Sequence, residues 1–128
     1  MEQIASDGAD WHFLCESAAL SEAGSAQVFE VVYQGQACRA FAIRCLGRVH
    51  AYLNRCSHVA LELDWLPGHF FDAEGRHLVC AAHGALFLPD TGACVGGLGR
   101  GPLVKIAVLE RNGVVYWQSG TALCPANT

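Results

Sequence analysis

Two short stretches of this sequence each place a cysteine and a histidine within four residues of each other. RCSHVALEL contains Cys56 and His58, and LVCAAHGALF contains Cys80 and His83. The four side chains follow the order Cys, His, Cys, His, with 21 residues between the two pairs. Because thiolates and imidazoles are metal ligands, a chain that uses all four must fold so that two distant segments reach one site.

This interleaved order differs from that of the common zinc sites. Zinc fingers place a cysteine pair before a histidine pair, and zinc ribbons use C-x-x-C knuckles. One thiolate and one imidazole on each segment instead suit a centre with two metal positions of different ligand preference. A Rieske 2Fe-2S centre is such a case, since one iron takes two thiolates and the other takes two imidazoles. Zinc held by the same four side chains, as a structural staple of an interaction module, is the alternative.

The length and composition indicate what kind of domain carries these pairs. The chain has 128 residues, about one domain, and a domain of this size buries roughly two thirds of its unfolded surface. Apolar residues make up 52% of the chain, charged residues make up 16%, and 14 residues are glycine. This composition favours a packed, β-rich fold with many turns over disorder.

The strand signals are short and frequent. Segments rich in β-branched and aromatic residues, bounded by turn residues, predict strands at residues 29–33, 39–46, 49–53, 104–109 and 114–117. Gly47-Arg48 is predicted to form a type II′ hairpin turn, and Asn112-Gly113 gives the strongest hairpin signal. Only residues 17–23 (SAALSEA) have a helical pattern, about two turns at most.

These elements predict an all-β architecture built from both ends of the chain. We expect an antiparallel sandwich or barrel base from residues 9–53 and 102–118, followed by a frayed C-terminal tail at residues 119–128. Residues 54–101, which are rich in turn signals, are expected to project from this base as short strands joined by tight turns. Both Cys/His pairs lie in that segment, at strand ends that enter loops, where binding sites are usually carried.

Taken together, the pattern resembles the Rieske iron-sulfur family, specifically its small soluble Rieske-type ferredoxins. The resemblance extends over about residues 11–117. Beside the ligand pairs, the matching positions are Ala51-Tyr52-Leu53-Asn54-Arg55, His83-Gly84-Ala85 with Phe87, Thr91-Gly92 and Pro102-Leu103.

The resemblance implies a single Rieske-type 2Fe-2S domain over residues 1–128, with one cluster per chain held by two projecting loops. It implies that Cys56 and Cys80 bind the inner iron, and that His58 and His83 bind the outer iron, closer to solvent. His77 also stands at ligand spacing from Cys80. We expect His77, like His69, to be a surface strand or turn residue; His12 and His50 have no partner in the sequence.

The remaining cysteines are not expected to bind the metal. Seven cysteines is an odd number, and without a secretory signal a disulfide framework is a poor explanation. Cys15, Cys38, Cys45 and Cys94 lie in apolar, strand-like settings, where a free cysteine behaves as a small hydrophobic residue. Cys124 is expected to be exposed in the C-terminal tail.

The charge limits the possible partners. A net charge of −4 and a pI near 5.8 argue against nucleic acid and against anionic membranes, which would need clustered basic residues. No apolar run approaches the roughly 18 residues of a spanning helix, and the acidic N-terminus is unlike a secretory signal. We therefore expect a cytoplasmic protein, and a monomer.

The expected function is electron transport. A cluster with four protein ligands has no vacancy for substrate, and the chain has no two-histidine, one-carboxylate site to activate oxygen, so we expect an electron-transfer component and no independent catalytic site. A flavin-dependent or similar reductase would load the cluster, and a terminal oxygenase or other redox enzyme would unload it. One alternative is a permanently bound Rieske subunit of a larger reductase, of the nitrite reductase type. Another is thiol catalysis by a Cys/His pair.

The expected reduction potential is low. High-potential family members have an extra cysteine in each loop, which form a disulfide, and a serine after the second His-Gly; here the corresponding positions are Leu61, Ala82 and Ala85. The sequence therefore predicts a potential near the low end of the Rieske range, about −150 mV. The family's usual proline after the T-G turn corresponds to Leu98, in a glycine-rich stretch that is expected to be less rigid.

Overall fold

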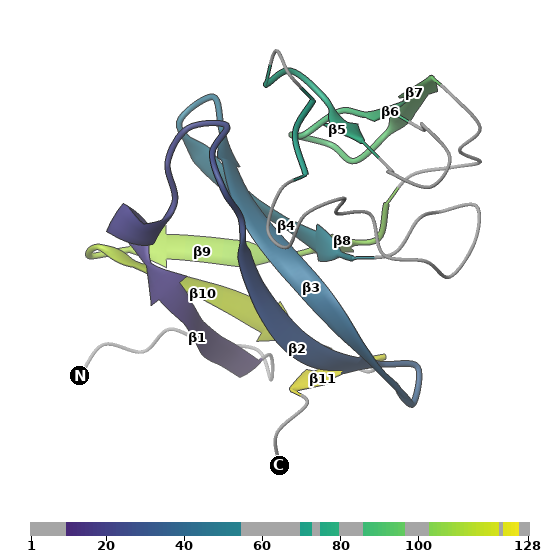
Figure 1. The fold of residues 1–128 in the computed structure, drawn as a ribbon. Helices are drawn as coiled ribbons and strands as arrows, with labels where there is room; N and C mark the ends of the chain where they lie inside the picture. Colours follow the sequence, from purple (N-terminus) through teal and green to yellow (C-terminus); the bar gives the residue numbers. More distant parts are fainter. Residues whose placement is uncertain are drawn as a thin grey trace.

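The computed structural model describes residues 10–54, 70–72, 75–79, 86–96, 103–120 and 122–125 (Figure 1). The predicted all-β fold is confirmed. In chain order the elements are β1 (Asp10–Glu16), the 3-10 helix η1 (Ser17–Ala19), β2 (Gln27–Tyr33), β3 (Gln36–Cys45), β4 (Arg48–Leu53), β5 (Leu78–Val79), β6 (Leu86–Phe87), β7 (Cys94–Gly96), β8 (Lys105–Ile106), β9 (Val108–Arg111), β10 (Val114–Ser119) and β11 (Leu123–Pro125). No helix among these elements is long and apolar enough to cross a bilayer.

The strands form three sheets, and every pairing between neighbouring strands is antiparallel. The strand orders are β1-β10-β9, β11-β2-β3-β4-β8 and β5-β6-β7. The first two sheets make up the base. Figure 1 shows the small sheet of β5, β6 and β7 at one end of the molecule, with β11 at the opposite end.

The central strands β3 and β4 bury both of their faces. In β3, Ala40 and Ala42 belong to the core that is shared with β1 and β10, whereas Phe41 and Ile43 belong to a second core with the small sheet. Successive residues of a strand point to opposite faces, which explains why this stretch lacks a polar alternation. Small residues therefore face one sheet and large residues face the other.

The hairpin turns confirm one prediction and correct another. Asn112-Gly113 joins β9 to β10, with positive φ at both residues (54° and 78°), the pattern of a type I′ turn. The predicted turn at Gly47-Arg48 is wrong by one residue and in type. The turn is Leu46-Gly47, again with positive φ at both residues, and Arg48 already pairs with Cys45. Leu46 was assigned to a strand because leucine rarely adopts this conformation.

The predicted strand at residues 104–109 is divided between two sheets. Ile106 pairs with Ala51 of β4 in the five-stranded sheet, whereas Val108 pairs with Trp117 of β10 in the other sheet. Between them, the carbonyl of Ala107 accepts a hydrogen bond from the N–H of Gln118 at 3.0 Å. Alternation in sequence fixes which residues share a face, but it does not show where a strand changes partner.

The predictions at both ends of the base need correction. The helix expected at residues 17–23 is reduced to η1, because so short a helix has little stability of its own and Arg44 binds its backbone. The tail expected at residues 119–128 is not entirely frayed, because β11 pairs with β2 in register, including Cys124 with Val32. Cys124 is exposed, as predicted.

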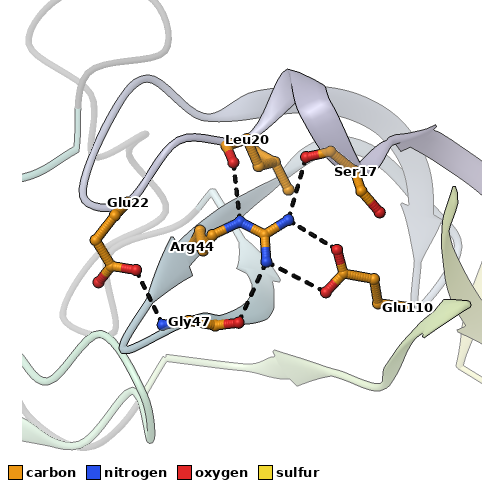
Figure 2. Close-up of polar contacts among 6 residues, drawn as sticks. All are labelled: Ser17, Leu20, Glu22, Arg44, Gly47 and Glu110. Atoms are coloured by element: carbon orange, nitrogen blue, oxygen red, sulfur yellow. Dashed lines mark hydrogen bonds and ion pairs between the residues drawn. The ribbon is translucent and has the colours of Figure 1, made fainter. Parts of the chain in front are cut away.

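Arg44 connects three parts of the base (Figure 2). Its guanidinium donates to the carbonyls of Ser17 and Leu20 at 3.1 and 2.9 Å, and to both carboxylate oxygens of Glu110 at 3.2 and 2.8 Å. On the other side, the carboxylate of Glu22 accepts hydrogen bonds from the backbone N–H groups of the Leu46-Gly47 turn. The bonds to Ser17 and Leu20 satisfy carbonyls that a longer helix would have paired with its own N–H groups.

Glu110→Gln is expected to lower the free energy of unfolding at pH 7 by about 0.2–1 kcal/mol, the range for ion pairs at the protein surface. The guanidinium of Arg44 holds the pKa of Glu110 below its ordinary value. The stabilisation is therefore present above the unfolded pKa, about 4.3, and is lost as the pH falls through the folded pKa. In urea titrations, the difference in the free energy of unfolding between Glu110→Gln and wild type should therefore shrink as the pH falls through the folded pKa. A constant difference, or an equal effect in the control Glu16→Gln, would contradict this.

Candidate metal centre

All four predicted ligands, Cys56, His58, Cys80 and His83, lie outside the described residues. The same is true of Leu61, His69, Ala82, Ala85 and Leu98. What the structure places is the residues on either side of the ligand segments. These residues determine where each segment leaves the folded sheets and where it returns.

Four of these flanking residues stand side by side at one end of the small sheet. The carbonyl of Phe70 accepts a hydrogen bond from the N–H of Val79 at 2.9 Å. Val79 pairs with Leu86, and Leu86 pairs with Gly96. Val79, Leu86 and Gly96 are the last or first residues of β5, β6 and β7 at that end, and Phe70 is the first described residue after residue 69.

Three segments therefore begin or end at the same edge. Residues 55–69, which include Cys56 and His58, return to the sheet at Phe70. Residues 80–85, which include Cys80 and His83, leave it at Val79 and return at Leu86. The glycine-rich residues 97–102 leave it at Gly96. The fold thus brings the roots of both Cys/His segments next to each other, although 21 residues separate the pairs.

The small sheet is attached to the base through aromatic rings. Phe70 is buried and stacks on Phe41 of β3, with the ring centroids 3.8 Å apart and the ring planes 11° apart. Phe41 also lies against Tyr52 of β4, at 5.9 Å. Leu78 and Phe87 are fully buried in the same cluster. The strands that carry the ligand segments are therefore packed into the core of the domain.

The start of the first segment is fixed independently. The N–H of Leu53 donates to the carbonyl of Val104 at 3.0 Å, and the N–H of Asn54 donates to that of Arg39 at 2.8 Å. Asn54 is buried, although it is a polar residue that is usually exposed. The backbone just before Arg55 and Cys56 is therefore held on both sides by neighbouring chain segments.

Tyr52 fixes the turn between β6 and β7. Its hydroxyl donates to the carbonyl of Pro89 at 2.7 Å, and a Cβ at Gly92 would come within 2.7 Å of the Tyr52 ring. Gly92 also has a φ of 78° and its carbonyl accepts the N–H of Leu103 at 2.9 Å. Burial, together with the carboxylate of Asp90, raises the pKa of Tyr52, so the hydroxyl stays protonated and remains a donor.

These supporting contacts were not predicted from the sequence, although a signal was present. A buried tyrosine needs a partner for its hydroxyl, and a T-G turn permits a close approach that a larger residue would prevent. The strand pattern around Tyr52 did not show which carbonyl would be within reach. The contacts became evident only when residues 52 and 89 were seen together.

The remaining described histidines and cysteines have other roles. Nδ1 of His77 lies 3.3 Å from a carboxylate oxygen of Asp72, in keeping with its predicted place in a surface turn. The five described cysteines are not joined in disulfides, and Cys15 among them is buried. Within the described residues, no group of three or more His, Cys, Asp or Glu side chains is placed to hold a metal ion. The four ligands therefore stay a prediction.

Comparison with known families identifies the chain. The model of the Rieske [2Fe-2S] domain family matches residues 10–107, a span that includes both Cys/His pairs. No curated protein matches the chain significantly.

Among solved structures, the fold is shared with proteins of carbazole 1,9a-dioxygenase. The ferredoxin from Nocardioides aromaticivorans IC177 is 23% identical, with a TM-score of 0.66 over 84% of this chain and 95% of that chain. The terminal oxygenase from the same organism is 21% identical, with a TM-score of 0.64 over 87% of this chain and 30% of that chain. At these identities the likeness shows the fold alone. The fold therefore occurs both as nearly a whole ferredoxin and as less than a third of a longer chain.

Proposed function

Because this chain belongs to the Rieske 2Fe-2S domain family, we propose that it is a one-electron carrier that passes electrons from a reductase to a terminal oxygenase or another redox enzyme. The observation that carries the proposal is the family match over a span that contains Cys56, His58, Cys80 and His83. The family binds a 2Fe-2S cluster, which favours this cofactor over the zinc alternative.

We assign Cys56 and Cys80 to the inner iron, and His58 and His83 to the outer iron. Two thiolates and two imidazoles fit the ligand preference of such a cluster. The adjacent roots of the two ligand segments, at Phe70 and at Val79, support a shared site. When bound, the cluster accepts and donates one electron. The imidazoles, being neutral, leave less negative charge around it than four thiolates would.

The described residues have a supporting role in this proposal. Tyr52 and the stacked rings of Phe41 and Phe70 hold the small sheet against the base, which fixes the residues at which the ligand segments begin and end. Electron transfer is favoured when a centre changes its geometry little, so a rigid base suits a carrier. No residue of the chain is assigned to bond making or bond breaking, and we propose no independent catalytic site.

The proposed partners follow from the same reasoning. A terminal oxygenase is supported by the shared fold with the carbazole 1,9a-dioxygenase ferredoxin, and by a second matched structure, which is the reduced complex between oxygenase and ferredoxin in carbazole 1,9a-dioxygenase. A flavin-dependent or similar reductase, a cytoplasmic location and a monomeric state are further parts of the proposal.

A permanently bound subunit, of the nitrite reductase type, is the second candidate. Such a subunit needs a contiguous apolar interface. Within the described residues, the exposed large apolar side chains lie on separate elements: Phe13, Leu46, Val95 and Val104. This arrangement supports the carrier. Size-exclusion chromatography separates the two candidates, because a carrier elutes alone and a subunit elutes with its partner.

A redox titration tests the low potential. We expect a midpoint near the low end of the Rieske range, about −150 mV, because Leu61, Ala82 and Ala85 offer neither a disulfide nor a hydroxyl donor to the cluster. A serine at position 85 should raise the potential, since it adds a hydrogen-bond donor. A wild-type midpoint well above zero would refute the assignment to the low-potential group.

A further inference from the structure

A groove opens in the base where two sheets separate. β8 pairs with β4, with Ile106 opposite Ala51. After Ala107 the chain leaves β4 and continues as β9, which pairs with β10. The part of β4 before Ala51 therefore has no β8 residue beside it. A cavity of about 410 Å³ lies here, lined by Arg48, Val49, His50, Lys105, Ile106, Ala107, Val108 and Glu110.

The charge of this groove differs in sign from that of the whole chain. Arg48 and Lys105 are exposed cations on its wall. Nζ of Lys105 donates a hydrogen bond to the carbonyl of Asp90 at 2.8 Å and lies over the Tyr52 ring, 5.9 Å from its centroid; an ammonium has three donors, so it can also contact a carboxylate. The one carboxylate of the lining, Glu110, lies 2.8 Å from Arg44 and is already paired. The groove is therefore a positive site on a chain with a net charge of −4.

His50 also lines the groove, and the charges of the groove shift its pKa. Burial lowers its pKa, and the nearby charges of Lys105 and Arg48 lower it further, while Asp90 acts in the opposite direction. A lowered pKa favours the neutral imidazole. The ring already has a hydrogen bond with the backbone of Cys45, and an imidazole has a second ring nitrogen that can donate or accept, so the groove offers a directional contact as well as charge.

We propose that this groove is a docking site for an acidic segment of the protein with which the chain exchanges electrons, the segment's carboxylates lying against Arg48 and Lys105. The partner's identity as a redox protein rests on the proposed function. Charge complementarity argues for this occupant, because Arg48 and Lys105 are exposed cations of the lining and its one carboxylate, on Glu110, is paired with Arg44. A charged groove apart from the small sheet would orient the partner and speed encounter.

A binding assay with a defined probe tests the proposal. The probe is a fluorescein-labelled peptide of alternating Glu and Ala, titrated with the holoprotein at low ionic strength and followed by fluorescence anisotropy. Arg48→Glu and Lys105→Glu should each weaken binding by about tenfold or more, because each removes one charge-assisted contact and puts an anion in its place. The matched control is Arg76→Glu, which makes the same charge change at an exposed position outside the groove and should alter affinity by less than about twofold.

Four results would overturn the proposal: no saturable binding, an equal loss with Arg76→Glu, displacement of the peptide by inorganic phosphate at millimolar concentration, or groove-dependent sedimentation with vesicles of phosphatidylcholine and phosphatidylserine. Phosphate displacement would indicate a small-anion site, and sedimentation would indicate a membrane surface. Iron and sulfide are measured in the same samples. A folded protein that binds the peptide but lacks the cluster would refute the proposed function and not the groove.

Discussion

Replacing Cys56 or Cys80 with serine is expected to leave the protein without its iron-sulfur cluster. Each thiolate is one of only two assigned to the inner iron, and a serine hydroxyl is a poor substitute because it is not ionised at neutral pH. Metal binding and ordering of the ligand segments are coupled, so the loss of one ligand should release the whole cluster. Iron and acid-labile sulfide should fall from about two atoms of each per chain to nearly none.

The same substitution elsewhere in the chain provides the control. Cys124 is an exposed free thiol on β11, and Cys94 is a half-buried free thiol on β7, in the small sheet itself. Cys124→Ser and Cys94→Ser should retain the full content of iron and sulfide and the visible absorption spectrum. Cys56→Ser or Cys80→Ser protein with a full complement of iron would show that the ligand assignment is wrong.

The second large effect is expected at Phe70. Phe70→Ala should lower the free energy of unfolding by about 3–5 kcal/mol, the usual cost of removing a buried phenyl ring. Phe70 is only 1% exposed and stacks on Phe41, so the cavity would open between the base and the small sheet. Because Phe70 is the residue at which the first ligand segment returns to the sheet, the variant should also lose its cluster to a chelator faster than wild type.

Chemical denaturation, followed by circular dichroism and by visible absorbance in one sample, measures both effects. Phe13→Ala is the matched control, because Phe13 is 63% exposed on β1 and should cost less than about 0.5 kcal/mol. The account would be contradicted if Phe70→Ala unfolded within about 1 kcal/mol of wild type. It would also be contradicted if both phenylalanine variants released iron at the same rate.

The sequence predicted the features that depend on local chemistry. Asn112-Gly113 marked a hairpin because asparagine and glycine readily adopt positive φ. The all-β class followed from short strands separated by turn residues. The Cys/His order indicated a centre with two kinds of metal position, and the family match is consistent with that interpretation.

The features that were missed depend on contacts between distant residues. The turn at Leu46-Gly47 was misplaced because leucine was interpreted as a strand residue. The change of sheet at Ala107 depends on Gln118, which is hydrogen-bonded to it across the fold. The hydrogen bond from Tyr52 to Pro89 joins residues 37 apart in sequence. In each case the deciding partner lies outside the local pattern, so periodicity and propensity could not identify it.

The central claim is that residues 55–69 and 80–85 each supply one thiolate and one imidazole to a single 2Fe-2S cluster. An electron paramagnetic resonance spectrum of the dithionite-reduced protein tests it most directly. We predict the low average g value of a 2Fe-2S centre with imidazole ligands, in protein that contains iron and sulfide in equal amounts. A spectrum with no such signal, from protein that contains one divalent ion and no inorganic sulfide, would contradict the claim.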